Sequence, residues 1–306
     1  MAATIIEKSI AKPLGSYSLW HGDVESFLSA LPGEVQFDFI VTSPPYNIGK
    51  EYEERLPLPQ YLRWQYRIIR EVVKRLKEGG SLCWQVGSYV DDGSIMPLDL
   101  LFAPIFRRFK ELRLRNRIIW HYGHGLHAKR RFSGRYETVL WYTKGNDYVF
   151  DLDAVRVPSK YPSKRAYKGS RAGTLSGNPL GKNPTDFWIA SHSSVWDHIP
   201  NVKSNHIEKT EHPCQFPVAL VERLLRALTN EGDLVFDPFA GVGTAGVAAA
   251  LLKRRFIGCE PVTQYVKTAQ LRIDAAISGT VPYRSHDIPL YDHTRSRLSE
   301  IPEEWS

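Results

Sequence analysis

The stretch "DLVFDPFAGVGTAGVAAALLKRRFIGCE" (233–260) decides the fold class of this 306-residue chain. Its first residues, 233–237, predict a strand, "AGVAAALLKRR" (245–255) predicts a helix, and "FIGCE" (256–260) predicts a second strand. Glycines fill the turn between the first strand and the helix, where the backbone must bend tightly. A strand, a glycine turn, a helix and a strand in this order indicate part of a parallel sheet.

The same alternation of strands and helices runs through the rest of the chain. Further strands are predicted at 35–43, 81–86, 115–122 and 137–143, and further helices at 60–77, 98–110, 217–229 and 262–277. The helix at 60–77 is expected to stop at Gly79-Gly80, a common helix terminator. This pattern predicts an α/β fold with a doubly wound sheet.

The composition narrows the class of protein. Hydrophobic residues make up 42% of the chain, and no apolar run approaches the roughly 18 residues that a membrane helix needs. Cys83, Cys214 and Cys259 lie far apart, which argues for a reducing compartment and against a disulfide framework or a zinc site. We therefore expect a cytoplasmic protein, in the bacterial cytoplasm or nucleoid, without metal or membrane contact. The net charge of +7 favours an anionic partner.

The glycine turn predicts a nucleoside-containing ligand. Gly241, Gly243 and Gly246 satisfy the GxGxxG pattern, and Glu260 ends the next strand, where it can bind the hydroxyls of a ribose. Asp237 places a carboxylate at the strand tip, which would repel a pyrophosphate but suits a cationic amine. S-Adenosylmethionine therefore fits better than NAD. The structural alternative is a glycine turn that only packs a helix on a strand.

A second motif, "VTSPPYNIGK" (41–50), ends another predicted strand. Two prolines cannot continue a sheet ladder, because neither donates a backbone N–H. Ser43 and the Pro44 carbonyl can accept the two hydrogens of a planar amino group while Tyr46 stacks on its ring. Such a tip aims the nitrogen lone pair of adenine or cytosine at a methyl donor. The alternative is a proline-capped strand with a core tyrosine.

Together these motifs resemble those of the DNA amino-methyltransferases, [D/N/S]-P-P-[Y/F] and F-x-G-x-G. Their order, with "TSPPY" first and "DPFAGVGT" last, resembles the circularly permuted β class. "HGD" (21–23) and "KTEHPCQFP" (209–217) agree, although Phe216 stands where relatives usually have Lys. The resemblance implies a Rossmann-like, circularly permuted, mostly parallel seven-stranded sheet with an inserted target-recognition region.

The resemblance also assigns roles to individual residues. It implies that S-adenosylmethionine is held by Asp23, Thr210, His212, Asp237, Phe239, Gly241, Gly243, Thr244 and Glu260. It implies that the target base is held by the catalytic residues Ser43, Pro44, Pro45 and Tyr46. Because an amino group inside a duplex is inaccessible, it further implies base flipping.

A basic stretch lies between the two motifs. From Ala154 to Thr185 there is no acidic residue, and the stretch is rich in Gly, Pro and Ser. The cations expected to contact DNA are Lys160, Lys164, Arg165, Lys168, Arg171 and Lys182, together with Lys129, Arg130, Arg131 and Arg135 of the preceding loop. A solvated surface loop is the alternative.

These observations divide the chain into four predicted segments: a catalytic half at 1–153, a basic target-recognition insertion at 154–200, a cofactor-binding half at 201–280 and a C-terminal tail at 281–306. The resemblance implies double-stranded DNA as substrate, a homodimer, and a restriction endonuclease acting on the same site as a companion.

We therefore predict a site-specific DNA methyltransferase. Asn47 in "PPYN" and the pattern through "SNHIEKTEHPCQFP" resemble N6-adenine members, which favours adenine. Ser43 before Pro-Pro is commoner among N4-cytosine members, so cytosine stays the alternative. Protein glutamine methyltransferases carry their cofactor motif before the tip, an NAD enzyme leaves "TSPPY" unexplained, and an inactive DNA-binding module would not need both motifs intact. These three alternatives are less favoured.

Overall fold

The structure, a computed structural model, describes residues 4–8, 17–50, 53–122, 125, 127–189, 199–203 and 205–285. Its strands are β1 (Thr4–Lys8), β2 (Tyr17–His21), β3 (Phe37–Thr42), β4 (Leu76–Val86), β5 (Ser88–Asp91), β6 (Ser94–Pro97), β7 (Leu112–His121), β8 (Tyr136–Lys144), β9 (Phe187–Ile189), β10 (Leu234–Asp237) and β11 (Arg255–Glu260). Its helices are α1 (Val24–Ala30), α2 (Leu58–Arg75), α3 (Leu98–Phe106), α4 (Val218–Leu228), α5 (Thr244–Leu251) and α6 (Thr263–Ile277).

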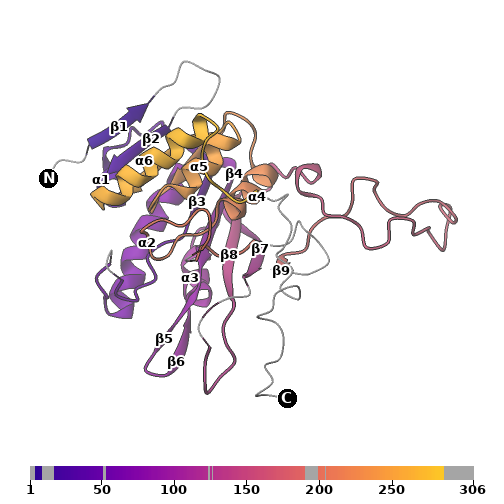
Figure 1. The fold of residues 1–306 in the computed structure, drawn as a ribbon, viewed down its shortest axis with the longest axis horizontal. Coiled ribbons are helices and arrows are strands. Elements are labelled where there is room, and N and C mark those ends of the chain that lie inside the picture. Colours follow the sequence, from indigo (N-terminus) through magenta and orange to yellow (C-terminus); the bar gives the residue numbers. More distant parts are fainter. Residues whose placement is uncertain are drawn as a thin grey trace.

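One sheet organises the molecule, with its strands in the order β1-β2-β11-β10-β3-β4-β8-β7-β9 (Figure 1). The five neighbours from β2 to β4 are parallel, while β8 runs antiparallel to both β4 and β7. These seven central strands confirm the predicted doubly wound, mostly parallel sheet. Two short edge strands extend it, because β1 pairs antiparallel with β2 and β9 pairs parallel with β7.

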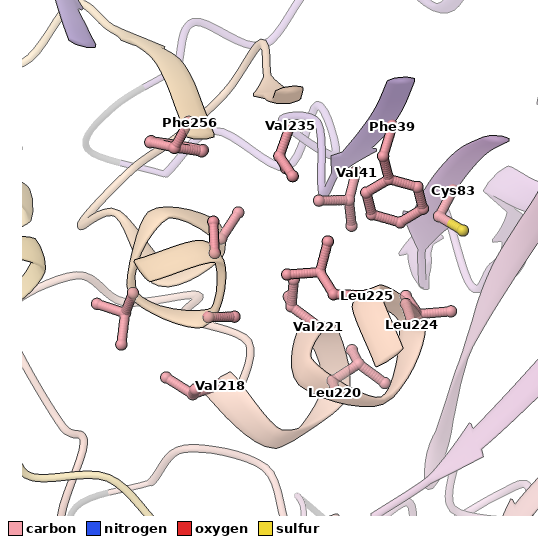
Figure 2. Packing of buried hydrophobic residues seen from close by; sticks show 14 of the residues in the cluster. Phe39, Val41, Cys83, Val218, Leu220, Val221, Leu224, Leu225, Val235 and Phe256 are labelled. Carbon is pink, nitrogen blue, oxygen red and sulfur yellow. The ribbon is translucent and has the colours of Figure 1, made fainter. Parts of the chain in front are cut away.

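Within the described residues, three helices cover each face of this sheet. The helices α1, α2 and α3 pack on one face around Ile40 and Trp84, and α4, α5 and α6 pack on the other around Phe39 and Val235. Figure 2 shows Val221 and Leu225 of α4 pointing toward Val41 of β3. Burying each large apolar side chain stabilises the fold by about 1.5–3 kcal/mol. The packing fixes where the ends of β3 and β10 lie.

The glycine pair at Gly79-Gly80 does not end a helix as expected. The helix α2 already ends at Arg75, and both glycines lie within β4. The register between β3 and β4 shifts there, and a Cβ on Gly79 would lie 2.6 Å from the carbonyl oxygen of Asp147. Gly79 also has a φ of +78°, in the left-handed region that favours glycine. The two glycines therefore allow an irregular backbone at the start of β4, where the backbone at Asp147 approaches closely.

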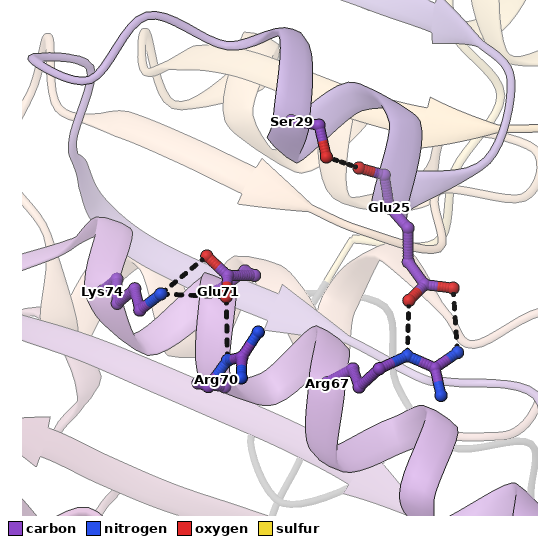
Figure 3. Close-up of polar contacts among 6 residues, drawn as sticks. All are labelled: Glu25, Ser29, Arg67, Arg70, Glu71 and Lys74. Atoms are coloured by element: carbon purple, nitrogen blue, oxygen red, sulfur yellow. Dashed lines mark hydrogen bonds and ion pairs between the residues drawn. The ribbon is translucent and has the colours of Figure 1, made fainter.

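Polar contacts join α1 to α2 (Figure 3). The guanidinium of Arg67 on α2 donates to both carboxylate oxygens of Glu25 on α1, at 2.9 and 3.3 Å. Glu71 accepts from Arg70 at 2.8 Å and from Lys74 at 3.0 Å on the same helix. Exposed pairs of this kind contribute about 1 kcal/mol or less each. The contact between Arg67 and Glu25 links α2 to α1, a helix that was not predicted from the sequence.

Residues 157–182, hereafter the arm, extend away from the sheet (Figure 1). Two isolated antiparallel bridges, Val157 with Lys182 and Arg165 with Leu175, tie its two branches together. Its far end exposes Tyr167, whose side chain is 91% accessible. The predicted insertion at 154–200 also contains β9, which lies outside the arm and pairs with β7 of the main sheet. Residues 190–198, and most of the tail predicted at 281–306, lie outside the described residues.

Candidate active site

A cavity of about 680 Å³ opens between the end of β3 and the turn after β10. Both sequence motifs reach it, because parallel strands end at the same edge of the sheet. The predicted site residues that line it are Asp23, Ser43, Pro44, Pro45, Tyr46, His212, Phe239, Gly241, Thr244 and Glu260. Motifs that are nearly two hundred residues apart in the sequence therefore share one cavity.

Three predicted cofactor residues do not line this cavity. Asp237 is fully buried, Gly243 packs against Ala269 of α6, and the Thr210 hydroxyl donates to Gln215 at 2.9 Å. A Cβ on Gly243 would lie 2.8 Å from the Ala269 side chain, and its φ of +74° also favours glycine. These three residues lie outside the cavity lining, and their predicted role in holding S-adenosylmethionine stays a prediction.

The glycine turn is held by the carboxylate of Glu260. One oxygen of Glu260 accepts from the backbone N–H of Gly241 at 3.0 Å, and the other accepts from that of Val262 at 2.8 Å. Burial raises the pKa of this carboxyl to about 7. Each carboxylate oxygen has a second lone pair, so Glu260 can still accept bonds from a ligand hydroxyl. The residue thus combines a structural contact with a free acceptor face.

Asp237 ends β10 beneath the cavity. One carboxylate oxygen accepts from the Thr42 hydroxyl at 2.6 Å and from the N–H of Phe239 at 3.0 Å. The other oxygen is buried and has no hydrogen-bond partner among the described residues. Burial raises the pKa of Asp237 to about 7, against the effect of these two hydrogen bonds. An unsatisfied buried oxygen indicates a place that a donor from a ligand or a water can complete.

Asp23 contributes a carboxylate at the opposite wall. It caps the N-terminus of α1, accepting from the backbone N–H of Ser26 at 2.8 Å and from its hydroxyl at 2.7 Å. Burial acts to raise the pKa of Asp23, but the hydrogen bonds from Ser26 outweigh it and lower the pKa. Asp23 therefore stays anionic at neutral pH and can attract a cationic ligand group.

His212 forms a neutral aromatic wall above the glycine turn. Its ring lies 4.7 Å from the ring of Tyr265, and its Nε2 would lie 3.3 Å from a Cβ on Gly241. Burial, with the nearby charge of Lys209, lowers the pKa of His212 to about 4. Phe216, which stands where relatives usually have Lys, also lines this cavity. A flat apolar surface of this kind suits a nucleoside.

The Pro-Pro-Tyr tip is pinned in place from both sides. The Tyr61 hydroxyl donates to the Pro45 carbonyl at 2.7 Å, and Asn47 exchanges two hydrogen bonds with the backbone of Leu56. Glu53 accepts from the N–H groups of Asn47 and the next residue, at 2.8 Å each. Asn47 adopts a left-handed φ of +63°, which these bonds hold. The tip is thus a rigid turn, as its prolines predicted.

Four cavity-lining residues on or directly after neighbouring strands were not predicted from the sequence: Gln85, Trp120, Tyr122 and Glu137. Tyr46 donates to Glu137 at 3.4 Å, and the Gln85 amide also donates to that carboxylate. Burial raises the pKa of Glu137 to about 7. Glu137 directly precedes an apolar run in "ETVLWYT", and a charged residue at the tip of a buried strand is the signal that could have found it.

The predicted DNA-contacting cations fall into two groups. Lys160, Lys164, Arg165, Lys168, Arg171 and Lys182 are all exposed along the arm. Lys129, Arg130, Arg131 and Arg135 lie in the loop between β7 and β8, where Arg135 is half-buried and the others are exposed. The Arg135 carbonyl accepts from the N–H of Tyr122 at 3.0 Å, which ties this loop to the cavity rim.

Other kinds of site find no support in the described ranges. None of their helices combines the length and hydropathy that crossing a bilayer requires. Nor do those ranges bring together three or more His, Cys, Asp or Glu side chains in an arrangement that could hold a metal ion.

Comparison with known sequences gives a consistent set of matches. A family model described as DNA methylase, covering N6 and N4 methyltransferases, matches residues 37–271. The type II methyltransferase M.BglII from Bacillus subtilis is 46% identical over 82% of this chain and 67% of its own length. M.ScaI from Streptomyces caespitosus is 36% identical over 88% and 86%, and the DNA adenine methyltransferase YhdJ from Escherichia coli K12 is 34% identical over 84% and 82%.

Solved structures share this architecture. A protein from Thermus thermophilus, solved as a complex with S-adenosyl-L-methionine, matches with a TM-score of 0.57 and 27% identity over 84% of this chain and 95% of that one. The cytosine-N4-specific PvuII DNA methyltransferase matches with a TM-score of 0.63 and 22% identity over 86% and 93%, which is evidence for the fold alone.

Proposed function

This chain belongs to the DNA methylase family of N6 and N4 methyltransferases, and we propose that it methylates the N6 amino group of adenine in duplex DNA. The observation that carries the proposal is the single cavity in which the Pro-Pro-Tyr tip and the glycine turn meet. One motif suits a planar amino group and the other suits a nucleoside, so the cavity brings an acceptor of a methyl group beside its donor.

The cofactor side of the cavity fits S-adenosylmethionine, whose sulfonium supplies an activated methyl group when it is bound. Asp23 offers an anionic carboxylate for the ammonium, and Glu260 offers acceptors for the ribose hydroxyls. His212 and Phe239 provide flat walls beside the glycine turn. Asp237 acts from behind by fixing the N–H of Phe239. No dinucleotide phosphate is favoured, because carboxylates rather than cations surround this end of the cavity.

The tip side of the cavity holds the target base. Tyr61 occupies the Pro45 carbonyl, so the Ser43 hydroxyl and the Pro44 carbonyl are the acceptors for the two amino hydrogens. Tyr46 stacks on the ring from one side. Holding both hydrogens leaves the nitrogen lone pair directed at the methyl group, so positioning accounts for much of the rate.

Adenine is favoured over cytosine by two observations. A relative that is 34% identical to this chain is a DNA adenine methyltransferase. Asn47 follows the tip in "PPYN", a pattern that resembles N6-adenine members. Methylation of cytosine at N4 is the second candidate, because serine rather than aspartate precedes Pro-Pro at Ser43. Either base presents the same amino group to the tip.

The base must leave the duplex to reach this cavity, so we propose that it is flipped. The exposed cations of the arm and of the loop before β8 neutralise backbone phosphates around the flipped base. We further propose a homodimer in the bacterial cytoplasm, and a restriction endonuclease with the same recognition sequence. The last point rests on similarity to two type II methyltransferases.

The direct test uses mixed-sequence duplex DNA and methyl-labelled S-adenosylmethionine. After digestion to nucleosides, mass spectrometry should detect N6-methyladenine. N4-methylcytosine instead would establish the second candidate, and label in protein or in no product would overturn DNA methylation as the function.

A further inference from the structure

A chain of hydrogen bonds leads away from the base-holding tip. The Ser43 hydroxyl donates to the Tyr46 hydroxyl at 3.2 Å, and the Tyr46 hydroxyl donates to a carboxylate oxygen of Glu137 at 3.4 Å. Glu137 belongs to β8, 91 residues from Tyr46 in the sequence, and all three side chains line the same cavity. The family motifs in the sequence include Ser43 and Tyr46 but not Glu137.

The neighbours of Glu137 hold its carboxylate in place beside Tyr46. The Gln85 side-chain amide on β4 donates to the same carboxylate oxygen that accepts from Tyr46. Gly87, which directly follows β4, leaves room for both partners, because a Cβ there would lie 3.0 Å from the Tyr46 ring and 3.2 Å from Glu137. Gly87 thus allows the ring of Tyr46 and the carboxyl of Glu137 to lie over the backbone.

Few other ionisable groups surround this carboxyl in the described residues. The Tyr122 hydroxyl, beyond the end of β7, is close enough to feel the charges of both Glu137 and Arg135, which belongs to the loop before β8. Cys214 acts in the same way on Tyr46. Burial raises the pKa of Tyr46 well above its ordinary value, so the hydroxyl stays a donor at neutral pH. Glu137 is therefore the acidic end of the chain.

The hydrogen bonds from Ser43 to Tyr46 and from Tyr46 to Glu137 settle which way the Ser43 hydroxyl points. A hydroxyl both donates and accepts, whereas a target amino group needs an acceptor. We propose that Glu137 is a positioning residue and the terminal proton acceptor of this methyl transfer, acting through Tyr46 and Ser43. Its carboxylate directs the Tyr46 and Ser43 hydrogens away from the base, so that the lone pairs of Ser43 face the amino group. The proposal rests on the proposed function.

The proton balance of the transfer follows this chain. The amino nitrogen forms a bond to the methyl carbon as the carbon–sulfur bond breaks, and the sulfur keeps the bonding electron pair. The nitrogen then carries a positive charge and gives one hydrogen to Ser43 Oγ. Ser43 passes its own hydrogen to Tyr46, and Tyr46 passes its hydrogen to Glu137. A carboxyl with a pKa of about 7 accepts this proton near neutral pH.

The test compares single-turnover methylation rates of wild type, Glu137→Gln, Glu137→Asp and Tyr46→Phe at saturating DNA and cofactor between pH 6 and 9. Wild type should slow below about pH 7, as Glu137 becomes protonated. Glu137→Gln should be slower at pH 8 by roughly tenfold to a hundredfold and should lose the acidic limb, whereas Glu137→Asp should retain it. The exposed Glu34→Gln is the matched control and should behave as wild type.

A double variant separates this chain from a merely structural role. Tyr46→Phe keeps the stacking ring but breaks the same chain, so adding Glu137→Gln to it should cost little more. Two results would overturn the relay: rate losses of the two single variants that multiply in the double variant, or a Glu137→Gln enzyme with the wild-type pH profile. Either result leaves the proposed function intact as long as the wild-type protein methylates DNA. A wild-type protein that methylates no DNA would instead reject the proposed function. If Glu137→Gln unfolds at a lower temperature than wild type, Tyr46→Phe alone tests the relay. The test is then its methylation rate and whether that rate still falls below about pH 7.

Discussion

The hydroxyl of Thr42 donates a hydrogen bond of 2.6 Å to the carboxylate of Asp237, joining residues that lie 195 positions apart in the sequence. Thr42 is the last residue of β3, next to the base-holding tip, and Asp237 is the last residue of β10, next to the glycine turn. The two strands are parallel neighbours. This hydrogen bond therefore links the two halves of the cavity directly, in addition to the pairing of their strands.

Replacing Thr42→Val should break that link. The change keeps the side-chain shape but leaves a buried carboxylate without its hydroxyl donor, which costs about 1–3 kcal/mol. We expect a lower urea midpoint and weaker binding of S-adenosylmethionine, measured by calorimetry. Thr42→Ser retains the hydroxyl and should stay close to wild type. Equal effects of both substitutions would show that packing, and not the hydrogen bond, matters at this position.

Substitutions on the two sides of the cavity should separate catalysis from cofactor binding. Tyr46→Ala removes the stacking ring, and stacking on a base contributes about 1–3 kcal/mol, so methyl transfer should fall by roughly tenfold or more. Its dissociation constant for S-adenosylmethionine should change little. Glu260→Gln should weaken binding of S-adenosylmethionine more than it slows methyl transfer from the bound cofactor. The amide is a weaker acceptor than the carboxylate for the Gly241 N–H and for the ribose hydroxyls. Equal loss of cofactor binding in Tyr46→Ala would contradict the division of roles.

The arm should contribute to DNA affinity through charge. A triple substitution of Lys164, Lys168 and Arg171 to Ser removes three exposed cations that can each neutralise a phosphate. The slope of log affinity against log salt should then become shallower by about 0.9 for each phosphate that is no longer neutralised. Titration of a fluorescent duplex at several salt concentrations measures this slope.

The matched control changes three exposed cations on other elements, Arg107, Lys110 and Lys267, to Ser. It removes the same net charge from the chain. If the control shifts the salt slope as much as the arm substitutions do, the arm binds no phosphate specifically and is a solvated loop.

The sequence predicted those parts of the fold that have a local cause. The alternation of apolar residues in β3 and the glycine turn between β10 and α5 are local signals, and both elements formed within a few residues of the predicted ranges. The prediction failed at Gly79-Gly80, because a glycine pair reads the same in a helix stop and in an irregular strand. Only the approach of Asp147, far along the chain, distinguishes them.

The residues of the site were likewise predictable from the sequence only where the signal is local. The residues of the two motifs were predictable, because proline and glycine constrain the backbone wherever they occur. Glu137 and Gln85 were not, since their meeting with Tyr46 depends on the order of β3, β4 and β8 in the sheet. The burial of Asp237 was not predictable either, because it depends on the neighbours of β10 in the sheet.

The buried carboxyls should give the cofactor-free protein an unusual pH dependence. Burial raises the pKa of Asp237 to about 7, whereas an aspartate in an unfolded chain titrates near 4. Between these values the folded state binds a proton that the unfolded state has released, so the free energy of unfolding falls as pH rises from about 4 to about 7. Glu260, with its pKa also raised to about 7, acts in the same direction.

Asp237→Asn should remove part of this dependence. Asparagine keeps an oxygen that can accept from Thr42 and Phe239, but it carries no charge at any pH. Melting curves without cofactor should show the variant more stable than wild type at pH 8, by about 1–3 kcal/mol, and closer to it at pH 5. For a chain of this size that corresponds to a rise of about 2–4 °C per kcal/mol. Asp147→Asn, an exposed control, should keep the wild-type slope, and an unchanged slope in Asp237→Asn would show that Asp237 is ionised in the folded protein throughout this range.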